Sequence, residues 1–192
     1  MEDRLTARLL AKADIGNRSE ERNALRLTPV ELPLRYDNPS SGVELLPGLS
    51  CYHDAPHAEF ATSVLAPGSV RLTLYQFAGS YMSLAVMVPS AVRRAFRPGC
   101  LLQIGLEIEA TRPLTTFLRL NVQNAQAVEV LHETIVVGRE RRNVSFDLGS
   151  LRGTDSDVKS TWLDIILSDP EFCEIDLSGV LFEVKDRGAP SF

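Results

Sequence analysis

The chain has 192 residues, of which 44% are hydrophobic, and a formal net charge of -5. A chain of this length buries a core without a metal or a disulfide, so we expect one main domain with a terminal appendage. The acidic balance argues against a nucleic-acid binder and gives no polybasic segment for an anionic membrane. No apolar run approaches the roughly 18–20 residues needed to span a bilayer, so no membrane insertion is expected.

The three cysteines, Cys51, Cys100 and Cys173, are far apart and form no CxxC pair. An odd number at wide spacing predicts free buried thiols and no disulfide framework. The first residues alternate charge with leucine and lack the apolar segment of a signal peptide. We therefore expect synthesis in the cytoplasm, with incorporation into a particle as one route out of the cell.

Residues 1–42 are predicted to form a helical arm and a linker. Leucines at four-residue spacing near the start are typical of one helical face, and Ser19 is a good N-cap for a second helix to about Arg26. Prolines punctuate residues 27–48, which predicts an irregular linker. Because a solitary binding module has little use for such an arm, we expect an oligomer that assembles through residues 1–40.

From residue 43 the chain alternates apolar and polar side chains, a period of two that predicts half-buried strands. The expected strands are 59–65, 70–77, 81–88, 101–110, 116–123, 127–137, 143–148, 161–167 and 177–184. Residues 78–80 and 138–143 are expected to be hairpin turns, and residues 91–96 one helical turn.

No amphipathic helices alternate with these strands, which disfavours a doubly wound α/β fold. Short strands separated by turn residues favour a mainly β protein, an antiparallel jelly roll or β-sandwich with a short helical N-terminal arm. The jelly roll is expected over residues 43–186, and residues 187–192 are expected to form a C-terminal tail.

Polar and aromatic side chains opposite the predicted core give the first candidate site. We take eight as candidate ligand-binding residues: Phe117, Arg119, Asn121, Gln123, Trp162, Asp164, Glu107 and Tyr81. If their strands share a sheet, they form a polar groove with aromatic ends. Sugars suit such a groove, because their hydroxyls bond to amides and carboxylates while their C–H faces stack on aromatic rings. The alternative is an ordinary solvated sheet face.

The sequence offers two other candidate sites, one for a metal ion and one for hydrolysis. Potential metal ligands cluster in Cys51-Tyr52-His53-Asp54-Ala55-Pro56-His57. Their spacing matches no standard metal site, which favours a loop with incidental histidines. No metal or cofactor is therefore predicted. A glycosidase needs two carboxyls roughly 5–10 Å apart. The available acids are Glu107, Glu109, Asp164 and Asp169, and nothing marks any two of them as an acid and a base, so no enzyme activity is predicted.

Several segments together resemble an uncharacterised alphaproteobacterial family of the Rhodobacter type: His53-Asp54, Gln76-Phe77-Ala78-Gly79-Ser80-Tyr81-Met82-Ser83-Leu84, Arg119-Leu120-Asn121-Val122 and Trp162-Leu163-Asp164-Ile165-Ile166. The last third is also similar to galactose-binding-like, carbohydrate-binding jelly rolls. There a Trp-bearing strand precedes an Asp-Pro turn and a final apolar strand, as Asp169-Pro170 and its neighbours do here. The resemblance implies a jelly roll and glycan recognition.

Two functions stay open on the sequence. The first is a non-catalytic module that recognises a glycan such as a cell-surface polysaccharide. The second is a structural component of a phage-like particle or gene transfer agent, with protein subunits as its partners.

Overall fold

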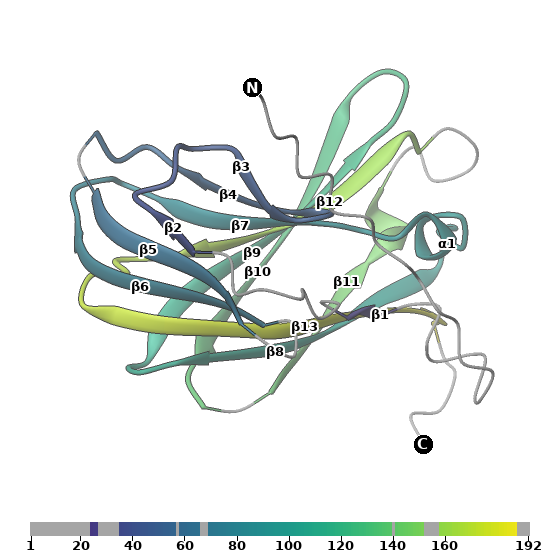
Figure 1. Cartoon of the computed structure of the whole chain (residues 1–192). Helices are drawn as coiled ribbons and strands as arrows, with labels where there is room; N and C mark the ends of the chain where they lie inside the picture. The colour runs from purple at the N-terminus through teal and green to yellow at the C-terminus, as the bar shows by residue number, and fades with distance from the viewer. Residues whose placement is uncertain are drawn as a thin grey trace.

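The structure is a computed structural model that describes residues 24–26, 35–56, 58–65, 69–139, 141–151 and 158–187. These residues form two antiparallel sheets that face each other as a sandwich (Figure 1). The prediction of a mainly β, antiparallel sandwich is therefore confirmed. Within the part of the chain that is described, no helix is long and apolar enough to cross a membrane.

One sheet, here called the back sheet, has the strand order β11-β8-β13-β6-β5-β2, with β1 also paired to β13. Its strands are β1 (Ala24–Arg26), β2 (Arg35–Asp37), β5 (Ala58–Leu65), β6 (Ser69–Phe77), β8 (Cys100–Ala110), β11 (Arg142–Asp147) and β13 (Cys173–Asp186).

The other sheet, here called the front sheet, has the order β10-β9-β12-β7-β4-β3. Its strands are β3 (Val43–Leu46), β4 (Leu49–His53), β7 (Met82–Met87), β9 (Leu114–Gln123), β10 (Val128–Val137) and β12 (Ser160–Leu167). The single described α-helix, α1 (Ser90–Arg93), leads from β7 into β8, and a 3-10 turn, η1 (Leu148–Ser150), follows β11.

The last eight strands define a jelly roll. Strand order β6-β13-β8-β11 in the back sheet lies opposite β7-β12-β9-β10 in the front sheet, so the chain repeatedly crosses between layers. That interleaved order is the double Greek key of a jelly roll. The predicted jelly roll is confirmed in its topology.

The core lies between the sheets and follows the period-two pattern. Strand β8 buries Leu102, Ile104, Leu106 and Ile108, and β9 buries Leu118, Leu120 and Val122. Strand β12 adds Leu163, Ile165 and Leu167. These were the positions predicted to point inward, because successive side chains of a strand alternate between its two faces.

The predicted N-terminal helices can be compared with the structure only in part. Residues 1–23 lie outside the described residues. Residues 24–26, expected at the end of a helix, instead form strand β1, with Ala24 opposite Leu181 of β13. The helical prediction is wrong there, because ladder hydrogen bonds to β13 override a weak local helix preference.

Part of the predicted linker is also ordered into strands. Strands β3 and β4 form a hairpin whose turn is Pro47-Gly48, and Gly48 has a φ of +79°. A proline followed by a residue with positive φ suits a tight turn of type II. The predicted irregular linker is therefore wrong at β2 and β3, while β4 lies within the predicted jelly roll.

The two predicted hairpin turns instead carry the chain from one sheet to the other. Residues 78–81 connect β6 of the back sheet to β7 of the front sheet, and the segment after β10 leads back to β11. At the first crossing, a Cβ added to Gly79 would lie 2.5 Å from Asp54 Oδ1 and 2.8 Å from Phe77 Cζ. The corner is shaped by residues distant in sequence, which local turn chemistry does not reveal.

Gly79 gives a direct test of this corner. We expect Gly79→Ala to lower the free energy of unfolding by about 1–3 kcal/mol, because the added methyl group overlaps atoms that cannot all move away. Urea unfolding of the full chain measures the change. Gly138→Ala is the matched control, since a Cβ there meets nothing within 4 Å. Equal stabilities for the two variants would contradict the packing described.

Candidate ligand-binding face

The outward side chains of the front sheet lie on one surface, here called the front face. Residues directly opposite each other in an antiparallel pair point to the same side of the sheet. Trp162 of β12 lies opposite Asn121 of β9 and Met87 of β7, and Asp164 lies opposite Arg119. The register thus brings four of the predicted site residues, Trp162, Asp164, Arg119 and Asn121, into two adjacent rows.

Exposed apolar side chains gather on this face. Seven of the nine large hydrophobic side chains that are exposed in the described residues belong to it, by strand register or by lining its hollow: Tyr52, Tyr81, Met87, Phe117, Val128, Val130 and Val136. The other two are Tyr75 and Phe172. A contiguous apolar patch with a polar centre marks an interaction site more often than a plain solvated surface.

The polar centre is a small hydrogen-bonded network. Arg119 Nε and Nη2 both donate to Asp164 Oδ2, at 2.9 and 2.8 Å. Asn121 Nδ2 donates to the same oxygen at 2.9 Å and to the main-chain oxygen of Arg119 at 3.1 Å. The Asp164 side chain is 6% exposed and that of Arg119 is 45% exposed. The buried carboxylate therefore fixes an arginine whose outer edge faces solvent.

A hollow of about 710 Å³ lies over this network. Its walls come from β4, β7, β9 and β12: Ser50, Tyr52, Tyr81, Ser83, Ala85, Met87, Arg119, Trp162, Asp164 and Ile166. Aromatic rings and hydrogen-bonding groups alternate across four neighbouring strands. Because adjacent strands are 4.7–4.9 Å apart, the hollow crosses about 14 Å of sheet.

Asp54 binds the backbone next to Tyr81, at one end of the hollow. Its Oδ1 accepts hydrogen bonds from the main-chain N–H of Ser80 at 2.8 Å and of Tyr81 at 3.1 Å, and its Oδ2 accepts one from the Ser80 hydroxyl. These bonds lower the pKa of the Asp54 carboxyl, with the Ser80 hydroxyl as the largest cause. Asp54 thus orders the backbone that presents Tyr81.

Seven of the eight predicted site residues belong to the front sheet or border its hollow, and one does not. Gln123 lies at the end of β9 and accepts a hydrogen bond from the Ser160 hydroxyl at 2.6 Å. Glu107 is on β8 of the back sheet, 3.6 Å from Arg141, so its assignment to this groove is wrong. The reason is that the chain crosses between sheets after β8, so β8 and β9 are neighbours in sequence only. Ligand binding by the remaining seven stays a prediction.

Reasoning from sequence missed Tyr52, Ser83, Met87 and Ile166, which also line the hollow. Each lies at an outward position of its own strand, so the alternation of apolar and polar residues could have shown that it points away from the core. What was absent was the neighbour relation among β4, β7 and β12, which depends on contacts distant in sequence.

Of the segment 51–57 that carries potential metal ligands, His57 lies outside the described residues. Cys51 is fully buried in the core, and burial raises the pKa of its thiol to about 12. His53 Nε2 lies 2.9 Å from the Pro39 oxygen, and its ring meets the Phe60 ring edge-on at 5.2 Å. Among the residues that the structure describes, no three His, Cys, Asp or Glu side chains are placed to hold a metal ion.

A second hollow, of about 690 Å³, lies beside His53 at one end of the sandwich. Phe60 and Phe77 line it, and Glu59 and Glu171 are its acidic residues. Some of its described polar groups bond to main-chain atoms, as Asn38 Oδ1 accepts from the N–H of Phe60 at 2.9 Å, and none of its described lining residues forms an arginine–carboxylate pair.

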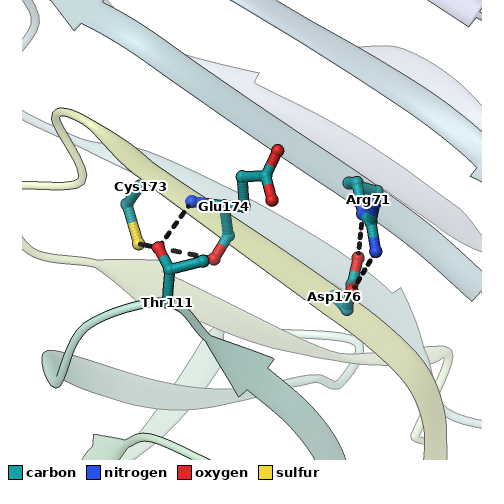
Figure 2. A network of polar contacts seen from close by, with 5 residues as sticks. All are labelled: Arg71, Thr111, Cys173, Glu174 and Asp176. Atoms are coloured by element: carbon teal, nitrogen blue, oxygen red, sulfur yellow. Dashed lines mark hydrogen bonds and ion pairs between the residues drawn. The ribbon is translucent and has the colours of Figure 1, made fainter.

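The outer side of the back sheet has a different character. Arg71 Nε and Nη2 each donate to a separate oxygen of Asp176, both at 2.7 Å, which is a bidentate ion pair (Figure 2). Thr111 Oγ1 accepts a hydrogen bond from the main-chain N–H of Glu174 at 3.1 Å nearby (Figure 2). Only Tyr75 presents an exposed aromatic ring on the described strands of this sheet.

The chain belongs to the DUF6478 family, a family of unknown function, whose model matches residues 2–189. This agrees with the resemblance to an uncharacterised family, and the alphaproteobacterial origin stays a prediction. The sequence matches no curated protein.

Solved structures are similar to this chain at low identity. The enzymatically active domain of tailspike protein 4 from bacteriophage CBA120 is similar with a TM-score of 0.50 at 12% identity, over 78% of this chain and 21% of that one. A carbohydrate-binding module, CBM4, has a TM-score of 0.49 at 11% identity, over 81% of this chain and 96% of the module. A family 30 carbohydrate-binding module has 0.43 at 9%, over 90% and 94%. The chain thus spans about a fifth of the tailspike structure, and that likeness concerns the fold alone.

The lowered pKa of Asp54 predicts a defined pH dependence. Because the folded-state pKa lies below the ordinary value, the stabilisation is complete above that ordinary value and is lost as the pH falls through the lowered one. We expect the stability advantage of the natural chain over Asp54→Asn to shrink in the acid range. Urea unfolding of both proteins at a series of pH values measures it, and an advantage that stays constant down to strongly acid pH would contradict it.

Proposed function

We propose that the front face binds a glycan and that the protein is a non-catalytic binding module. The observation that carries the proposal is the hollow, whose lining combines Trp162, Tyr52 and Tyr81 with the Arg119–Asp164 pair that Asn121 also binds. Aromatic rings offer flat apolar surfaces, and the network offers fixed donors between them.

The chemistry of sugars matches this arrangement. A pyranose ring presents C–H groups on its faces and hydroxyls around its rim, so it pairs with an aromatic ring below and with polar groups at its edge. Arg119 keeps N–H groups that do not bond to Asp164, and its half-exposed side chain lines the hollow. Because Asp164 already holds the guanidinium in place, binding costs less side-chain entropy than a free arginine would.

The carboxylates considered for hydrolysis do not favour catalysis. Asp164 is buried and accepts three hydrogen bonds on one oxygen, while Glu107 and Glu109 are on β8 of the back sheet. An acid and a base that act on one glycosidic bond must flank it within roughly 5–10 Å. The arrangement supports recognition of a sugar, and the described residues that line the hollow include only one carboxylate, Asp164.

Substitution of the aromatic rings tests the proposal. In affinity electrophoresis of the full chain through gels that contain a soluble polysaccharide, we expect at least one polysaccharide to retard the protein. Trp162→Ala and Tyr52→Ala should each weaken that binding about tenfold or more, as for aromatic anchors at the centre of an interface. Tyr75→Ala is the control, since Tyr75 is exposed on β6 of the back sheet. Binding unchanged in both front-face variants would refute the assignment of the site.

A protein subunit is the second candidate occupant, because Val128, Val130 and Val136 are exposed along β10, the edge strand of the front sheet. Exposed apolar edge strands associate with other chains unless they are covered. If no polysaccharide retards the protein and light scattering of the full chain gives a defined oligomer, the particle-component function replaces the glycan-binding one.

A further inference from the structure

We propose that Asp164 makes the front face selective for uncharged glycans, because its buried carboxylate neutralises Arg119 and repels uronic acids. The inference rests on the proposed function and names the ligand class of the same site. Asp164 is assigned as a specificity-determining residue that acts through Arg119.

The charge balance of the hollow supports this assignment. Of the described residues that line it, Arg119 and Asp164 alone are charged, and their charges cancel. An isolated arginine beside aromatic rings would be a site for a carboxylate, because the guanidinium fork matches carboxylate geometry. Here Nε and one Nη2 hydrogen are already directed at Asp164 Oδ2. The donors that remain can serve hydroxyls, which bring no second negative charge.

Asp164 is held so that it cannot leave Arg119 when a ligand arrives. Its side chain is 6% exposed, and Asn121 Nδ2 binds the same carboxylate oxygen at 2.9 Å from the adjacent row. Asn121 is itself anchored to the main-chain oxygen of Arg119. A uronate that approached Arg119 would therefore lie close to a fixed carboxylate that repels it, while the charge of Arg119 is already compensated.

Asp164→Asn is the informative change, and Arg119→Gln alone is not. Asparagine keeps the shape and an oxygen that accepts from Asn121, and it leaves Arg119 half exposed, so the charge is unmasked with little damage. Removal of Arg119 alone leaves a buried carboxylate without its cation, which is strongly destabilising. The double variant Arg119→Gln with Asp164→Asn removes both charges together and is the matched neutral control.

The back sheet supplies a second control. Asp176→Asn removes the carboxylate that pairs with Arg71 (Figure 2) and changes the net charge by the same amount, but on the back sheet, where Glu174 still acts on Arg71 as a second negative charge. The exposed aromatic residue Tyr75 lies on that sheet, whereas the hollow lined by Trp162, Tyr52 and Tyr81 lies over the front sheet. A gain in acid binding that came only from the altered net charge would appear in this variant as well.

The experiment is affinity electrophoresis of the full chain and these variants against two panels. The neutral panel is soluble β-glucan, uronate-free arabinoxylan and galactomannan, and the acidic panel is polygalacturonate and alginate. We expect the natural chain to bind at least one neutral polymer and neither acidic one. Asp164→Asn should gain about tenfold or more in affinity for an acidic polymer, the effect of one charge-assisted hydrogen bond. The double variant and Asp176→Asn should show no such gain.

The outcomes separate the two claims. If the natural chain binds acidic polymers as tightly as neutral ones, or Asp164→Asn gains nothing, or the controls gain equally, the charge-masking role is refuted while glycan binding stands. If the natural chain and Asp164→Asn are folded by circular dichroism and bind neither panel, glycan binding itself is refuted and the selectivity with it.

Discussion

The register between β9 and β12 is the constraint on which the front face depends. It sets Asp164 opposite Arg119 and Trp162 opposite Asn121, so that one buried carboxylate oxygen accepts three donors from β9. A shift of one residue would turn Leu163 and Ile165 outward and carry the polar network into the core. The apolar partners of the same strands, which are fully buried, resist that shift. Core packing and site geometry are thus two consequences of one alignment.

The corner around Asp54 positions Tyr81, which borders the hollow of the front face. Strand β7 reaches the front sheet only because the chain crosses between layers at residues 78–81, where Gly79 fits against Asp54 and Phe77. The bonds from Ser80 and Tyr81 to Asp54 then fix the point at which β7 begins. Asp54 thus has a definite structural role, which is to position Tyr81 at the border of the hollow.

How far the sequence predicts this structure depends on the range of the contacts involved. Period-two alternation correctly assigned the inward residues of β8, β9 and β12, because the order of apolar and polar residues within one strand shows which of its faces is buried. It also selected Arg119, Asn121, Trp162 and Asp164, since polar or aromatic residues at outward positions stand out locally. Glu107 was misplaced and Tyr52 was missed, because alternation does not say which strands are neighbours. Strands β1 (24–26) and β3 (43–46) were not predicted for the same reason, because each is stabilised by a partner strand.

The most direct test of the central claim uses the single tryptophan of the chain, Trp162, which lines the hollow. Its fluorescence reports on the front face without a label or a substitution. Titration of the full chain with a neutral polysaccharide that retards it should shift or quench the emission, with saturation at the affinity found by electrophoresis. If binding saturates and the Trp162 emission does not change, the glycan binds elsewhere on the protein, and the account of the front face is wrong.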